Sequence, residues 1–187
     1  KRTTQNIILK SMDKIEIKKQ LLDFTVNSVD NFLNEHPNVE FYSFAYDCNA
    51  EYAEINLCFN TETEFEKTLK HYQTGEFSKH YQSEEDINDL KFNTGDWEYQ
   101  CFETLNVLTD DELTKIFNDL PEDDYKSWNE FVGNLLEIFC ETLIEFTNTE
   151  TFKKIPKTDN FLTFCIDHDE DFEDAIKRLE NVKKKYA

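Results

Sequence analysis

The acidic stretch CIDHDEDFED, residues 165–174, has the residue types that bind a divalent cation, because six of its ten side chains are carboxylates. Three of them stand at the alternate positions that supply the first ligands of an EF-hand loop. These residues are Asp167, Asp169 and Asp171. Phe172 then stands where that loop requires glycine, and Arg178 where it requires a bidentate glutamate. The stretch is therefore not an EF-hand.

The same stretch is also typical of the beginning of a helix. Carboxylates accept hydrogen bonds from the unpaired N–H groups of a first turn and complement the positive end of the helix dipole. Three lysines at 183–185 complement the negative end of the same predicted helix. We favour this interpretation and keep a divalent-metal site, in a binding domain or a metal-dependent enzyme, as the alternative. Its ligands would be Asp167, His168, Asp169 and Asp171.

Other catalytic patterns are absent from the sequence. With three glycines the chain cannot build a glycine-rich phosphate-binding loop, and no G-x-S-x-G is present. The four histidines have no zinc-site spacing, and the five cysteines form no C-x-x-C pair. We predict a protein without a cofactor and without catalytic residues, with buried free thiols kept reduced in the cytoplasm.

Hydrophobic periodicity predicts an α+β fold with a small, mostly antiparallel sheet of about three or more strands, covered by helices in the order α-β-β-α-α-α-β-α. The predicted strands cover residues 39–48, 52–59 and 161–166, and the first two are expected to form a hairpin. The predicted helices begin near residues 13, 61, 109, 124 and 171. Thr109 with Glu112 has the spacing of a capping box. Residues 76–93 read as the least regular segment.

The length of 187 residues fits a single domain, residues 1–187. Forty acidic against twenty basic residues give a formal net charge of −20, which disfavours nucleic acid as a partner and favours a basic protein. No apolar stretch has the length of a membrane span, and no signal peptide is recognisable. The same charge also serves solubility, so it does not by itself establish a partner.

Three stretches in succession resemble the domain-of-unknown-function family 4303, a group of uncharacterised, mostly bacterial proteins. They are FYSFAYDCNAEYAEINLCFNTETEFEKTL (41–69), NTGDWEYQ (93–100) and LIEFTNTETFKKIPKTDNFLTFCIDHDEDFEDAIKRL (143–179). The chain departs from the family pattern near the tryptophan, where Lys91-Phe92 and Asp96 replace the family's arginine-tryptophan and glutamate. The resemblance implies an intracellular α+β domain like those of immunity proteins, which neutralise bacterial toxins.

These observations favour a non-enzymatic, immunity-like binding protein that covers a basic toxin. Trp97, which follows a turn in a polar segment, is a candidate aromatic anchor, with packing of its own segment against a helix as the alternative. Four acidic clusters are candidate contacts. They are Glu84-Glu85-Asp86, Asp110-Asp111, Glu122-Asp123-Asp124 and Asp169-Glu170-Asp171.

Overall fold

Four strands form one sheet in the computed structural model, which describes residues 14–74, 78–120 and 125–186. The strands are β1 (Phe41–Asn49), β2 (Glu54–Asn60), β3 (Tyr99–Asn106) and β4 (Lys157–Asp167), in the spatial order β3-β2-β1-β4. The predicted hairpin is confirmed, since β1 and β2 pair antiparallel, as do β2 and β3. β4 lies parallel to β1, so the sheet is mixed.

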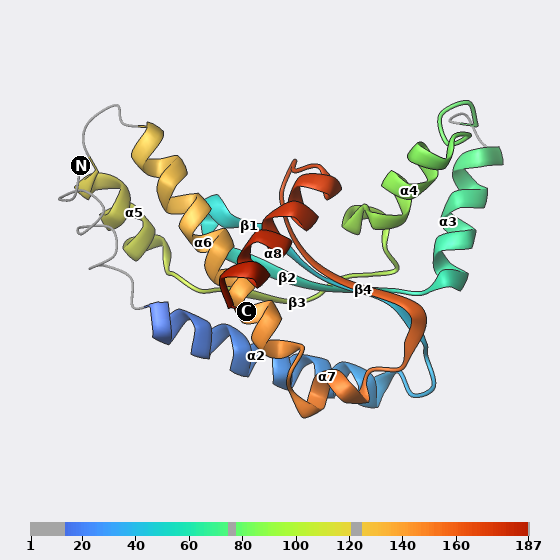
Figure 1. Cartoon of the computed structure of the whole chain (residues 1–187), viewed down its shortest axis with the longest axis horizontal. Helices are drawn as coiled ribbons and strands as arrows, with labels where there is room; N and C mark the ends of the chain where they lie inside the picture. Colours follow the sequence, from blue (N-terminus) through green and yellow to red (C-terminus); the bar gives the residue numbers. More distant parts are fainter. Residues whose placement is uncertain (1–13, 75–77, 121–124, 187) are drawn as a thin grey trace.

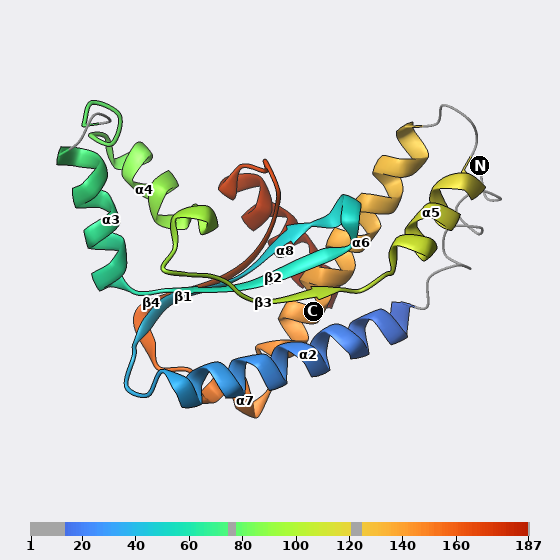
Figure 2. The same ribbon diagram turned by 180° about the vertical axis from the view of Figure 1, so that it is seen from behind.

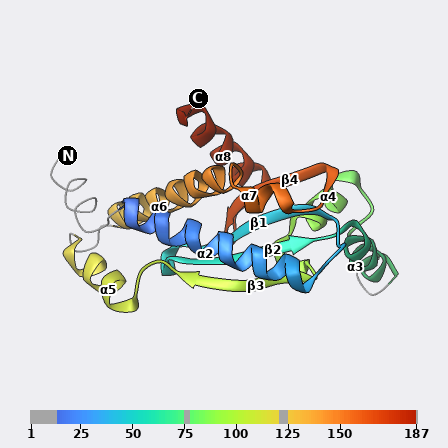
Figure 3. The ribbon, with the colours of Figure 1, turned by 90° about the horizontal axis from the view of Figure 1, so that it is seen from below.

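Helices pack on both sides of this sheet (Figures 1 and 2). The longest are α2 (Lys14–Glu35) and α6 (Tyr125–Phe146), which cross one face together with the short α7 (Glu150–Lys154). Figure 3, which looks onto this face, shows α2 running beside α6 and α7. The remaining helices are α3 (Glu62–Thr74), α4 (Glu84–Phe92), α5 (Asp110–Asp119) and α8 (Phe172–Tyr186), with short 3-10 turns η1 (Ala50–Tyr52) and η2 (Thr94–Asp96).

The strands divide their side chains between two apolar cores. Phe44 and Tyr46 face α2 and α6, whereas Ala45 between them faces α3 and α4. Likewise Phe59 joins the first core and its neighbour Cys58 the second. This alternation follows from the period of two in a strand, and it explains why β1 is apolar along most of its length. The predicted α+β class is correct.

Three elements were missed by hydrophobic periodicity. β3 is an edge strand whose side chains are mostly exposed, so it has no apolar alternation. α4 lies in the segment expected to be irregular, and it is short, polar and acidic. Its Ser83-x-x-Asp86 capping box was a usable signal. α7 has five residues and no room for a periodic pattern.

Two sequence predictions about helix ends hold. Thr109 accepts from the Glu112 amide, and the Glu112 side chain accepts from the Thr109 amide, which is the predicted capping box. α8 has Glu173 and Asp174 in its first turn and three lysines in its last, as expected for a helix aligned with its dipole. No helix within the described residues is long and apolar enough to span a membrane.

Candidate functional site

A cleft of about 1140 Å³ separates α4 and η2 from the turn between β4 and α8. Ten of its twenty lining residues are Asp or Glu, against 40 of 187 in the whole chain, and neither Lys nor Arg is among the described residues that line it. These carboxylates are Asp47, Glu84, Glu85, Asp89, Asp167, Asp169, Glu170, Asp171, Glu173 and Asp174. The concentration of one charge in one concave surface makes the acidic cleft the candidate site.

The first wall of the acidic cleft is α4, which projects Glu84 and Glu85 from its first turn. The helix begins with a capping box in which the Asp86 amide donates to Ser83 Oγ at 3.0 Å and the Ser83 amide to Asp86 Oδ2 at 3.4 Å. Hydrogen bonding to Ser83 lowers the pKa of Asp86. Leu90, at 3% exposure, joins the second core, and so the other face of α4 is held against the sheet.

The segment after α4 is fixed by an aromatic cluster on the sheet. The Lys91 carbonyl accepts from Tyr42 Oη at 2.5 Å and from Trp97 Nε1 at 2.9 Å. Asn60 Nδ2 donates to the same Tyr42 hydroxyl oxygen at 3.1 Å. The Trp97 ring lies edge-on to Tyr42 and Phe164, with centroids 5.9 and 5.7 Å away. Contacts among residues of α4, of three strands and of the segment just after η2 thereby fix the position of the first wall.

The second wall is the turn that joins β4 to α8. Asp169 adopts a left-handed backbone conformation with φ of 63°, which aspartate tolerates better than most residues. The Glu170 carboxylate accepts hydrogen bonds from both terminal nitrogens of the Arg178 guanidinium and from the amide of Asp167. Arg178 also donates to the Cys165 carbonyl at 2.9 Å, so it ties this turn to the end of β4.

Two half-buried carboxylates form the floor of the acidic cleft. Asp47 Oδ2 accepts from the Thr94 hydroxyl at 2.9 Å, and Asp167 Oδ1 accepts from the Ala50 amide at 2.9 Å. Burial is the main cause that raises the pKa of each group above its ordinary value. Ionisation of Asp47 and Asp167 is therefore less favourable than in water, and such perturbed groups are common at functional sites.

Asp47→Asn is expected to raise the melting temperature at neutral pH, because asparagine removes a half-buried charge and can still accept from Thr94. Since the pKa of Asp47 is raised in the folded state, that state binds the proton more readily, and stability falls as pH rises through this window. The advantage of the variant should therefore shrink as the pH falls toward about 4, the ordinary pKa of aspartate, and disappear below about pH 3, where the carboxyl is protonated in both states. Thermal melts from acidic to neutral pH measure the difference in melting temperature between the variant and the wild type. An equal difference at every pH would contradict the prediction.

The structure separates the predicted contact residues into different roles. Glu84, Glu85, Asp169, Glu170 and Asp171 meet at the acidic cleft, although they come from two distant segments. Two residues of these clusters are already engaged within the fold: Asp86 in the cap of α4, and Glu170 in an ion pair with Arg178.

Asp110, Asp111 and Trp97 are not among the residues that line the acidic cleft. Asp110 and Asp111 begin α5, at the opposite end of the molecule from α3 and α4 (Figure 1). Glu122, Asp123 and Asp124 fall outside the described residues. Trp97 is 2% exposed, so the prediction that it anchors a partner is wrong, and the alternative of packing within its own fold is correct.

The alternative metal site is not assembled in the described residues. His168 and Asp169 are largely exposed, Asp167 is engaged by the Ala50 amide, and Asp171 does not join them in a group of converging ligand atoms.

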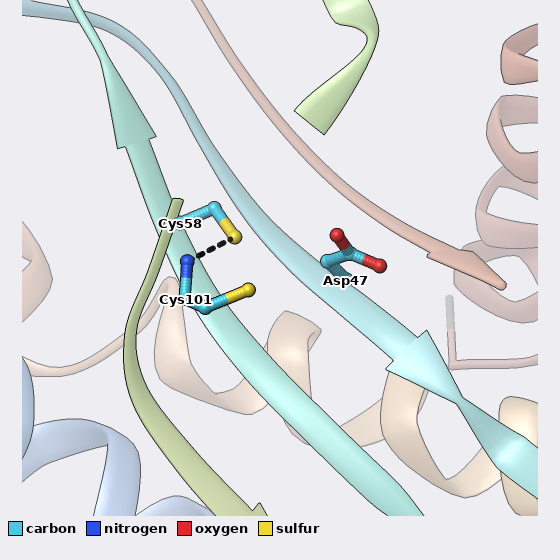
Figure 4. Close-up of side chains that lie close together, drawn as sticks. All are labelled: Asp47, Cys58 and Cys101. Carbon is cyan, nitrogen blue, oxygen red and sulfur yellow. Dashed lines mark hydrogen bonds between the residues drawn. The ribbon is translucent and has the colours of Figure 1, made fainter. Parts of the chain in front are cut away.

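A different group of ligand atoms does converge, and it shares Asp47 with the floor of the acidic cleft (Figure 4). In the part of the chain that the structure describes, one set of three potential ligands lies within 4.8 Å of one another: Asp47, Cys58 and Cys101. They come from β1, β2 and β3, and the Cys101 amide donates to Cys58 Sγ at 3.2 Å. Sequence spacing gave no signal for this group, because adjacent strands bring together residues 43 positions apart.

The cysteines differ in exposure. Four of the five are buried free thiols as predicted, but Cys101 is exposed, because β3 is an edge strand. Cys101 lies where the pairing of β2 with β3 shifts its register. Its φ of 47° is unusual for a residue with a side chain. Hydrogen bonding to Cys58 lowers the pKa of the Cys101 thiol, and the same interaction raises that of Cys58.

Comparison with protein families gives one match. The model described as domain of unknown function DUF4303 matches residues 21–183, which include every strand and both walls of the acidic cleft. Searches of curated proteins and of solved structures give no match.

Proposed function

Because the chain belongs to the DUF4303 family, whose description assigns no activity, we propose a function from its own surface: it is a non-enzymatic protein that binds a basic partner in the acidic cleft. The observation that carries this proposal is the gathering of ten carboxylates in one concave surface. The fuller form of the proposal is an immunity-like protein that neutralises a basic bacterial toxin in the cytoplasm. Five free cysteines support a reducing compartment.

A protein segment rich in Lys or Arg is the chemistry that this surface fits. Carboxylates on both walls face an open cleft, so cationic side chains entering it find charge on either side. A net charge of −20 adds long-range attraction, which speeds encounter at low salt. The same field repels phosphate backbones, which excludes nucleic acid as the proposed ligand.

The first experiment measures binding of a fluorescent oligolysine peptide by anisotropy at low and at high salt. The cleft variant carries Glu84→Gln, Glu85→Gln, Asp169→Asn and Asp171→Asn, two exposed charges from each wall. Glu170 stays unchanged because it pairs with Arg178. We expect the cleft variant to bind about tenfold more weakly or worse, and salt to weaken the wild type.

The matched control neutralises four exposed carboxylates outside the acidic cleft, and so has the same net charge as the cleft variant. Its substitutions are Asp110→Asn, Asp111→Asn, Asp119→Asn and Asp159→Asn. We expect the control to bind as the wild type does. Equal loss in both variants would show that overall charge, not the acidic cleft, attracts the peptide.

The partner itself is sought by pull-down from the lysate of the organism of origin, with the same three proteins at low and high salt. We expect mass spectrometry to find one basic protein retained by the wild type and the control and lost from the cleft variant. Retention of the same protein by all three would overturn the assignment to the acidic cleft.

A further inference from the structure

We propose that Asp47, Cys58 and Cys101 form a binding site for a zinc-class divalent cation beside the acidic cleft. The proposal goes beyond partner binding and does not depend on it. Two sulfur ligands and one carboxylate oxygen leave a tetrahedral cation with one further position, for water or for a group from outside the chain.

The geometry suits a cation with short bonds to sulfur. Zn²⁺ lies about 2.3 Å from a thiolate and about 2.1 Å from a carboxylate oxygen, so its two sulfur ligands are about 3.8 Å apart. The three ligand atoms already lie within 4.8 Å of one another, so side-chain rotations close the site. Figure 4 shows the two sulfur atoms directed to the same side of β2 and β3, toward the strand that carries Asp47.

Hydrogen bonds outside the ligand set hold two of its members in place. The Thr94 hydroxyl donates to Asp47 Oδ2 and orients the other carboxylate oxygen, and the Cys101 amide donates to Cys58 Sγ. Such outer contacts orient the ligands of metal centres and stabilise bound thiolates. The left-handed backbone of Cys101 costs free energy, and it directs the thiol of an exposed edge residue toward the same group.

The negative charge around this group favours a bound metal ion over two thiolates without a cation. The other nine carboxylates of the acidic cleft attract a dication and make further negative charge costly unless a cation neutralises it. Two sulfurs disfavour Mg²⁺ and Ca²⁺, which prefer oxygen ligands, and favour Zn²⁺. Cys101 is exposed and Asp47 partly exposed, so a cation reaches the site from the open surface.

The test is a titration of the phosphine-reduced full chain with Co²⁺, which reports thiolate ligation by a charge-transfer band, followed by displacement with Zn²⁺. We expect the wild type to bind one equivalent of metal and to melt at a higher temperature with Zn²⁺. The charge-transfer band should be weaker in Cys101→Ser than in the wild type. Asp47→Asn should bind more weakly, because it replaces the carboxylate ligand with a neutral amide oxygen.

Two controls remove one thiol and one carboxylate outside the group. Cys140→Ala and Asp159→Asn should bind as the wild type does, and circular dichroism verifies that every variant is folded. Absence of the band in the reduced wild type, or an equal band in Cys101→Ser, would overturn the proposal. No peptide is present, so failure here leaves the partner-binding proposal intact.

Discussion

Trp97→Ala is expected to lower the free energy of unfolding by about 3–5 kcal/mol, the loss typical for a large aromatic removed from a core. The ring is 2% exposed and packs edge-on against Tyr42 and Phe164. Alanine leaves a cavity behind α4 and also removes the indole donor to the Lys91 carbonyl. Urea denaturation measures the change.

Trp97→Phe separates packing from hydrogen bonding. Phenylalanine keeps most of the ring but lacks the N–H. It should therefore lower the free energy of unfolding less than alanine does, with about 1 kcal/mol of its effect due to the missing hydrogen bond. If Trp97→Ala were as stable as the wild type, Trp97 would not be part of the core. Because the segment behind α4 is fixed by this ring, oligolysine binding should weaken in Trp97→Ala even at temperatures where the chain stays folded.

Glu170→Gln is expected to lower the free energy of unfolding by about 2–3 kcal/mol, because it leaves Arg178 without its ionised partner. The two side chains are 18% and 19% exposed, so the loss lies below that of a fully buried pair. Glutamine also weakens the acceptor for the Asp167 amide. The turn that forms the second wall should then open more readily to hydrogen exchange.

The control is Glu150→Gln, which breaks an exposed pair with Lys153 on α7. It should change stability little, since exposed ion pairs contribute little. A double-mutant cycle with Arg178→Met isolates the pair: most of the loss in Glu170→Gln should vanish once the arginine is gone. Equal effects of Glu170→Gln and Glu150→Gln would mean that the Arg178 pair does not hold the turn.

The structural roles of two acidic residues decide which carboxylates can be used to test binding. Glu170 and Asp86 belong to predicted contact clusters, but each is occupied in the fold, one by Arg178 and one by the cap of α4. Neutralising them would confuse lost binding with lost structure. The exposed carboxylates Glu84, Glu85, Asp169 and Asp171 test recognition directly.

The stretches that carry the family resemblance meet in the structure. Tyr42 and Asn60 belong to the first, Trp97 to the second and Phe164 to the third, and hydrogen bonds or ring contacts join them. The residues that carry the family resemblance therefore include those whose packing supports the first wall. They do not form a catalytic motif. The family match over residues 21–183 covers all three stretches.

The sequence by itself determined the α+β class, the β1–β2 hairpin, the long helices and the acidic surface, because periodicity, caps and charge are local or additive properties. It did not reveal β3 or α4, whose polar side chains carry no apolar period. Only the tertiary structure decided that Glu84 and Asp169 face one cleft, that Trp97 is buried, and that Cys58 meets Cys101. Each of these depends on strand order and register, which bring together residues too far apart in sequence for local patterns to connect.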